Sequence, residues 1–87
     1  MKQIDIEIKH AVGLHARPAS LFVQTASKYD ADISIAYDGK TINAKSILGV
    51  LSLGVGKNAH ITISAEGDDE EDALEALSNL IESNFGE

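Results

Sequence analysis

The chain of 87 residues carries 14 Asp and Glu against 7 Lys and Arg, is 44% hydrophobic and has no cysteine. This length predicts a single domain over residues 1–87, because one domain takes on the order of 100 residues. The lack of cysteine excludes a disulfide scaffold, a Cys-ligated metal site and thiol catalysis. A formal net charge of −7 argues against binding to a nucleic-acid backbone, which requires a basic face.

The sequence gives no signal for membrane insertion or export. No apolar run approaches the roughly 20 residues of a membrane-spanning helix, and residues 1–5 do not resemble a signal peptide. We therefore expect a cytoplasmic protein. The acidic residues concentrate at the end of the sequence, since residues 66–87 contain nine of them and no basic residue. Such a segment is typical of a solvated helix face.

Four segments alternate between apolar and polar residues, as half-buried strands do. They span residues 2–8, 32–37, 40–43 and 60–65. Asp38 and Gly39 predict a tight hairpin between the second and third strands, because both residues tolerate the positive φ of a type I′ turn. The residues expected to face the core are Ile4, Ile6, Ile8, Ile33, Ile35, Ile42, Ile61, Ile63 and Ala65.

Three segments favour helices. Residues 16–28 and 69–84 show the apolar spacing of amphipathic helices, and Asp68, with Glu71 three residues later, is the expected N-cap of the second. Between them, Ser46 as N-cap and Gly54 as C-terminal stop predict one or two helical turns. The apolar stripes contain Ala19, Phe22, Val23, Ala26, Ala73, Leu74, Leu77, Leu80 and Ile81.

The predicted element order is β-α-β-β-α-β-α. Because each strand has one apolar face, a four-stranded, mostly antiparallel sheet with three helices on one face buries all of these residues. The expected fold is an α+β open-faced β-sandwich.

Residues 13–20, GLHARPAS, contain the side chains best suited to chemistry. Proline is tolerated in the first helical turn, so Pro18 places the helix start within a residue or two of Ala16 and places His15 at the cap. The free N–H groups of Ala16 and Arg17 and the positive helix end would then lie beside the imidazole. Arg17 adds a guanidinium that matches phosphate oxygens.

This arrangement suits a phosphoryl group on the imidazole of His15. The neutral ring nitrogen is the nucleophile, while the helix end and Arg17 stabilise the transferred anion. The helix dipole contributes only about 0.3–1 kcal/mol at an exposed site, so the group is held weakly enough to be passed on. A lone His-x-Arg pair is more often an ordinary surface histidine beside a solvated arginine. The longer motif is needed to distinguish a phosphoryl site from such a pair.

The string GLHARP closely resembles the active-site segment of HPr, the histidine phosphocarrier family of the bacterial sugar phosphotransferase system. The resemblance covers essentially the whole chain, including FVQTAS at residues 22–27 and KSILGVLSLG at residues 45–54. It implies the HPr-like fold and phosphorylation of His15 on Nδ1 (the pros nitrogen) by phosphorylated enzyme I. It also implies donation to sugar-specific enzyme II A domains, with Arg17 positioning the phosphoryl group. Such a protein is a covalent carrier rather than an enzyme, and we expect no cofactor and no metal.

One position departs from the family pattern. HPr proteins often carry a small polar residue at position 12 that can reach the phosphohistidine, whereas this chain has Val12. We expect transfer to survive without that hydrogen bond, because the backbone amides and Arg17 do not depend on it.

Residues 47–53 contain five large apolar side chains around one or two helical turns, so not all can face the sheet. Either loops cover the remainder, or the remainder forms a surface on which proteins dock. The HPr resemblance favours docking, with Val50 and Leu53 inside. On the first helix, residues 16, 20 and 24 recur along one face and are expected to complete the surface. The expected docking residues are Ala16, Ser20, Gln24, Ile47, Leu48 and Leu51.

Ser46 has an ordinary explanation as an N-cap, worth about 1 kcal/mol relative to Ala. Its context resembles HPr proteins that HPr kinase/phosphorylase phosphorylates on this serine. The resemblance then implies an effector that binds a catabolite-control transcription regulator. The alternative function is a purely regulatory HPr-like protein that acts through Ser46 on carbon catabolite control. Such proteins replace the active histidine, whereas this chain keeps His15.

Two further interpretations remain open. His10, His15 and His60 could form a metal site, although no carboxylate pair completes the coordination shell. A nucleic-acid or small-ligand α+β domain is disfavoured by the low basic charge and the few aromatic residues. We expect a monomer, because transient docking requires a free surface.

Overall fold

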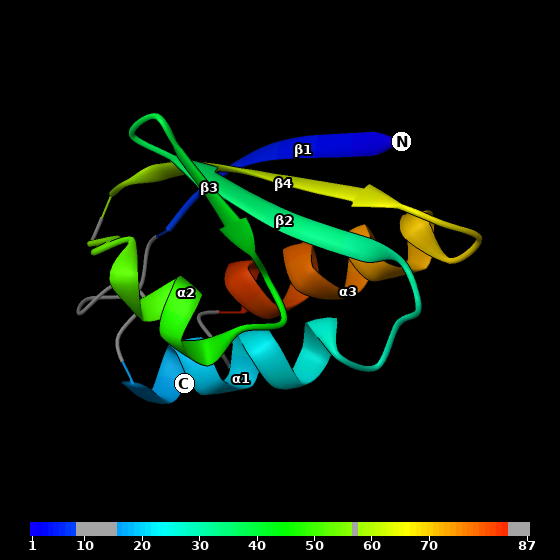
Figure 1. Ribbon diagram of the computed structural model, residues 1–87, viewed down its shortest axis with the longest axis horizontal. Coiled ribbons are helices and arrows are strands. Elements are labelled where there is room, and N and C mark those ends of the chain that lie inside the picture. Colours follow the sequence, from blue (N-terminus) through cyan, green and yellow to red (C-terminus); the bar gives the residue numbers. More distant parts are fainter. Residues whose placement is uncertain (9–15, 57, 84–87) are drawn as a thin grey trace.

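A computed structural model describes residues 1–8, 16–56 and 58–83. Figure 1 shows one layer formed by the sheet and a second layer formed by the helices, which all lie on the same face of the sheet. The predicted order of elements and the open-faced sandwich are confirmed. The elements are β1 (Lys2–Glu7), α1 (Ala16–Ala26), β2 (Asp32–Tyr37), β3 (Lys40–Asn43), α2 (Ile47–Ser52), β4 (His60–Glu66) and α3 (Glu70–Glu82).

The four strands form one sheet in the order β1-β4-β2-β3, and every neighbouring pair is antiparallel. β4 therefore lies in the centre, although it is the last strand in the sequence. The hairpin between β2 and β3 turns at Asp38 and Gly39, whose φ angles are 51° and 80°. Both angles are positive, as the type I′ prediction requires.

The core lies between the sheet and the helices, with Phe22 of α1 fully buried at its centre. Most of the predicted inward residues are buried, including those of β2 and β4, whereas Val23 of α1 and Leu80 of α3 are only partly buried. Ile4 and Ile6 of β1 and Ile42 of β3 are only partly buried. These three residues sit on the two edge strands, where one flank of each side chain has no neighbouring strand.

The start of α3 differs from the prediction. Its N-cap is Asp69, not Asp68, and the Asp69 carboxylate makes no hydrogen bond to its own helix. It accepts instead from the backbone N–H groups of Asp30, at 2.8 Å, and Ala31, at 2.9 Å. The carboxylate thus joins the turn before α3 to the connection between α1 and β2, a long-range contact that outcompetes local capping.

Glycine at position 67 is required for this contact. Gly67 has a φ of +153°, and a Cβ there would stand 2.8 Å from the Cα of Ala31. A side chain would therefore push apart the two segments that Asp69 holds together. The neighbouring Glu70 accepts a hydrogen bond from the Gly67 N–H at 3.1 Å.

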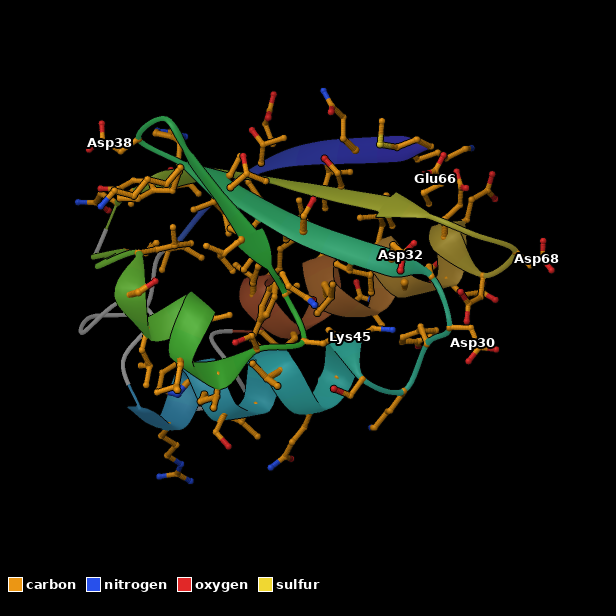
Figure 2. All side chains as sticks on the ribbon, viewed as in Figure 1. Asp30, Asp32, Asp38, Lys45, Glu66 and Asp68 are labelled. Atoms are coloured by element: carbon orange, nitrogen blue, oxygen red, sulfur yellow. The ribbon has the colours of Figure 1, made fainter. Side chains whose placement is uncertain are left out.

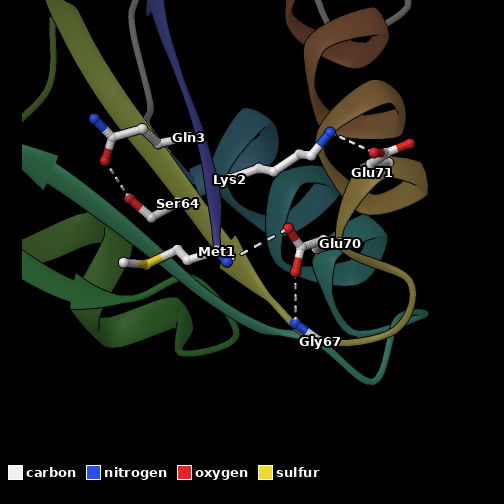
Figure 3. A network of polar contacts seen from close by, with 7 residues as sticks. All are labelled: Met1, Lys2, Gln3, Ser64, Gly67, Glu70 and Glu71. Carbon is white, nitrogen blue, oxygen red and sulfur yellow. Dashed lines mark hydrogen bonds and ion pairs between the residues drawn. The ribbon is translucent and has the colours of Figure 1, made fainter.

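The first turn of α3 also holds the start of β1. Glu70 lies 3.7 Å from the terminal ammonium of Met1, and Glu71 forms an ion pair with Lys2 (Figure 3). The predicted pairing of Glu71 with Asp68 in a capping box is therefore wrong. Opposite charge on the adjacent edge strand offers Glu71 a partner that the local sequence does not reveal.

Replacing Asp69 with Ala removes the acceptor for two backbone N–H groups, so we expect a lower free energy of unfolding at pH 7. The hydrogen bond from the Asp30 N–H, together with that from Ala31, holds the pKa of the Asp69 carboxyl below its usual value. The stabilisation is fully present above about pH 4, near the pKa in an unfolded chain. It is lost as the pH falls through the lowered pKa, because the carboxyl is then protonated.

Denaturant unfolding of the wild type and Asp69→Ala between pH 7 and pH 2 tests this expectation. The difference in stability should shrink only at the acid end. Asp68→Ala is the matched control, because Asp68 is an exposed carboxylate in the same turn. A deficit for Asp69→Ala that stays constant down to pH 2 would contradict the assignment.

Candidate functional site

The start of α1 lies where Pro18 predicts it. The helix begins at Ala16, with Pro18 buried in its first turn and Arg17 exposed beside it. The predictions for His15 and Val12 lie outside the described residues, as does the side chain of Ala16. The described part of the site is therefore the helix end and the guanidinium that follow the histidine in the sequence.

The two helices around this position carry a single charged side chain. Arg17 is the only charged residue of α1, and α2 has none. No carboxylate within either helix competes for the guanidinium. The first turn of α1 thus has a positive helix end and a cation, which together favour an anionic ligand.

Two of the predicted docking residues of α1, Ser20 and Gln24, lie on one side of the helix. Gln24 is exposed and Ser20 half-buried, and the Gln24 Nε2 donates a hydrogen bond to the Ser20 Oγ at 3.4 Å. Leu21 is partly buried and packs against the core. The polar side of α1 is therefore formed by Ser20 and Gln24.

The start of α2 follows the prediction closely. Ser46 has extended backbone angles, and its Oγ accepts a hydrogen bond from the Gly49 N–H at 3.1 Å, so it is the N-cap. The helix ends at Ser52, with Leu53 as its C-cap, followed by Gly54 with a φ of +65°. Both boundaries were readable from the sequence because each depends on a residue within three positions of it.

The outer side of α2 is an exposed apolar patch formed by Ile47, Leu48 and Leu51. Their side chains are 37%, 78% and 38% exposed, whereas Val50 and Leu53 are buried. This division confirms the predicted burial of Val50 and Leu53, while docking on the exposed residues stays a prediction. Contiguous exposed apolar residues on a small domain mark a surface for protein contact. Because α1 and α2 pack against each other, the patch adjoins the helix that begins at the candidate site.

A tether between α2 and the end of α1 was not predicted. The Lys45 Nζ donates a hydrogen bond to the carbonyl oxygen of Tyr29 at 2.7 Å. Lys45 immediately precedes the cap of α2, and Tyr29 follows the end of α1. The bond therefore fixes the start of α2 relative to α1. No pattern in the sequence predicts this hydrogen bond, because any backbone carbonyl can accept one from a lysine.

The carboxylates concentrate away from α2. Figure 2 shows Asp30, Glu66 and Asp68 around the end of the sheet where β4 leads into α3, whereas α2 lies at the other end of the view. In the same region, the exposed side of α3 carries Glu71 and Asp72. The carboxylates of residues 66–72 are thus kept apart from the apolar patch.

Other kinds of site find little support among the described residues. A cavity of 490 Å³ is lined mainly by polar side chains, most of them from β2 and β3, and by no residue of α1 or α2. No three His, Cys, Asp or Glu side chains in residues 1–8, 16–56 and 58–83 are grouped to hold a metal ion. Two histidines of the alternative metal site, His10 and His15, lie outside these ranges. No helix in the same ranges is long and apolar enough to cross a membrane.

Comparison with known proteins now places the chain in a family. Residues 2–83 match the PTS-HPr family model, described as the phosphorylation site of the HPr component of the phosphotransferase system (PTS). The chain belongs to the HPr family. A crystal structure of HPr-C-His from Thermoanaerobacter tengcongensis is similar, with a TM-score of 0.98 and 60% identity over 100% of this chain and 98% of that one. HPr from Bacillus anthracis str. Ames has a TM-score of 0.89 and 51% identity, over 92% and 95% of the two chains.

The relatives differ in assembly and role. A second structure of the T. tengcongensis protein is an HPr dimer, with a TM-score of 0.81 and 60% identity over 100% of both chains. Crh, a catabolite repression protein from Bacillus subtilis, forms a dimer with a swapped domain, with a TM-score of 0.76 and 43% identity over 97% of both chains. Dimers therefore occur with this fold, in contrast to the monomer expected from the sequence.

Proposed function

We propose that this chain is a phosphoryl carrier that accepts a phosphoryl group on His15 Nδ1 from phosphorylated enzyme I and donates it to sugar-specific enzyme II A domains. The observation that carries the proposal is the match of residues 2–83, which include His15, to the HPr phosphorylation-site family. We further propose that it acts in the cytoplasm, as a monomer during transfer.

In each transfer, one bond to phosphorus forms as another breaks. The neutral His15 nitrogen attacks phosphorus, and the bond to the enzyme I donor breaks; the enzyme II A acceptor then takes the group in the same way. The exposed guanidinium of Arg17 and the backbone N–H groups of Ala16 and Arg17 are the proposed partners of the phosphoryl oxygens. Neither α1 nor α2 supplies a carboxylate that would oppose the incoming charge.

The partners are proposed to dock on the apolar patch of Ile47, Leu48 and Leu51, together with the side of α1 formed by Ala16, Ser20 and Gln24. The patch supports this role because it is exposed and lies next to α1. A carrier with no catalytic machinery of its own must be placed into its partners' active sites. A docking surface beside the transferred group is what such placement requires.

We expect His15→Ala to abolish labelling by phosphoenolpyruvate and enzyme I, because no other residue would accept the phosphoryl group. Arg17→Ala should still be labelled, but about 100-fold more slowly, as expected for the loss of one pre-positioned donor. The measurement is the rate of transfer of labelled phosphate, with acid lability confirming a phosphohistidine. Lys28→Ala, which removes an exposed cation just beyond the other end of α1, is the control.

Label that still appears in His15→Ala would end the proposal for that residue. An unchanged rate in Arg17→Ala would remove the guanidinium from the site.

We expect Leu48→Asp to raise the KM for transfer from enzyme I by about tenfold or more, because a docked Leu side chain contributes about 1.5–3 kcal/mol when buried. The thermal unfolding temperature should hardly change, since Leu48 is 78% exposed. Thr41→Asp adds the same charge to an exposed position on β3 and is the control. Equal KM values for the two variants would show that the patch does not dock enzyme I.

A second function is supported by the position of Ser46 beside the patch and by the similarity to Crh. We propose that HPr kinase/phosphorylase phosphorylates Ser46, and that the modified protein binds a catabolite-control transcription regulator. A purely regulatory role through Ser46 is the alternative to the carrier function. The presence of His15 favours a protein that does both.

Incubation with ATP and a kinase/phosphorylase, followed by mass mapping, should yield a phosphorylated peptide that contains Ser46. Screened Coulomb repulsion between a phosphate on Ser46 and the carboxylates of a docked partner amounts to less than about 1 kcal/mol. Phosphorylated Ser46 should therefore slow acceptance by His15 only a few-fold unless apolar contact is lost as well. Ser46→Ala is the unmodified control, and absence of the modified peptide from the wild type rules out this switch.

A further inference from the structure

α2 contains a glycine that the fold does not obviously need. Gly49 is the third of its six residues, and glycine inside a helix costs roughly 1 kcal/mol relative to alanine. Its backbone is helical and does not have the positive φ that would favour glycine. A helix this short gains little from propagation and should benefit from every good helix former. Local preference therefore argues for a side chain at this position.

A side chain at position 49 would lie over Ser46. Cβ atoms of a helix point toward its N-terminus, so residue 49 leans back over the residue three positions earlier. A Cβ at Gly49 would stand 3.3 Å from the Ser46 Oγ, 3.4 Å from the Ser46 Cβ and 3.5 Å from the Ile42 Cβ. Only the first contact is tighter than ordinary van der Waals distance. Alanine would thus fit after a shift of a few tenths of an ångström, and the main effect of a side chain falls on the Ser46 hydroxyl.

The Ser46 hydroxyl is otherwise well placed to react. Ser46 is half-buried, and one lone pair of its Oγ accepts the bond from the Gly49 N–H at 3.1 Å. The other lone pair is not used by that bond. The next two residues, Ile47 and Leu48, are exposed, so a protein can reach this end of α2. The space that Gly49 leaves empty borders the reactive oxygen itself.

We propose that Gly49 is a specificity-determining residue for modification of Ser46: it keeps the approach to the Oγ open and leaves room for the phosphoryl group. This inference rests on the proposed phosphorylation of Ser46. In that step, the Oγ attacks the terminal phosphorus of a nucleoside triphosphate held by the kinase. The new O–P bond forms as the bridging P–O bond breaks, the nucleoside diphosphate leaves with the electron pair, and the hydroxyl proton passes to a base of the kinase.

The test compares Gly49→Ala and Gly49→Gln with the wild type. The rate of Ser46 phosphorylation by HPr kinase/phosphorylase and ATP should fall about tenfold in Gly49→Ala and about 100-fold in Gly49→Gln, because small misplacements of reacting atoms have effects of this size. Gly56→Ala is the control, since a Cβ at Gly56 meets nothing within 4 Å and its φ is not positive. It should be phosphorylated at the wild-type rate.

Two further measurements separate this role from a structural one. Labelling of His15 by phosphoenolpyruvate and enzyme I should be unchanged in Gly49→Ala, and its thermal unfolding temperature should be equal or higher because alanine favours helix. Wild-type rates of Ser46 phosphorylation in Gly49→Ala and Gly49→Gln would overturn the proposal. A parallel loss of His15 labelling and stability would also overturn it, by assigning Gly49 to folding. If the wild type is never phosphorylated on Ser46, the proposed regulation itself fails. That result differs from both outcomes that overturn the role of Gly49.

Discussion

All three helices pack on a single face of one sheet, and burial of that shared face determines the rest of the structure. Phe22 of α1, Val50 of α2 and Leu77 of α3 are each fully buried beneath the strands. Apolar side chains project from several sides of α2, but the helix packs on the sheet through one side only. Because Val50 and Leu53 face inward, Ile47, Leu48 and Leu51 face outward. The exposed patch is thus a direct result of the packing that secures the helix.

Features that depend on neighbouring residues could be predicted from the sequence. The strands follow from alternating isoleucines, the start of α1 from Pro18, and the ends of α2 from Ser46 and Gly54. Contacts between distant segments could not be predicted. Asp69 reaches backbone groups 38 and 39 residues away, and Lys45 reaches one 16 residues away. The backbone carbonyls that they use occur in every residue and the N–H groups in every residue but proline, so no residue type marks the contacts.

The candidate site was predictable to the same extent. Arg17 and the patch on α2 lie where the motif and the helical spacing place them, while the geometry around His15 is outside the described residues. The role inferred for Gly49 could not come from the sequence, because a glycine in an apolar run reads as a loss of helix stability and nothing more. The place that a Cβ of residue 49 would take beside the Ser46 hydroxyl is known only from the structure.

The two long-range tethers share a property that affects how the sequence can vary. In each, a side chain binds the main chain: Lys45 binds the carbonyl of Tyr29, and Asp69 binds the N–H groups of Asp30 and Ala31. The identity of residue 29 is therefore immaterial to its tether, and residues 30 and 31 need only avoid proline to keep theirs. The two tethers thus tolerate substitution in the connection after α1, although Ala31 is also constrained by its burial beside Gly67. Preservation of the tethers depends on one lysine and one aspartate.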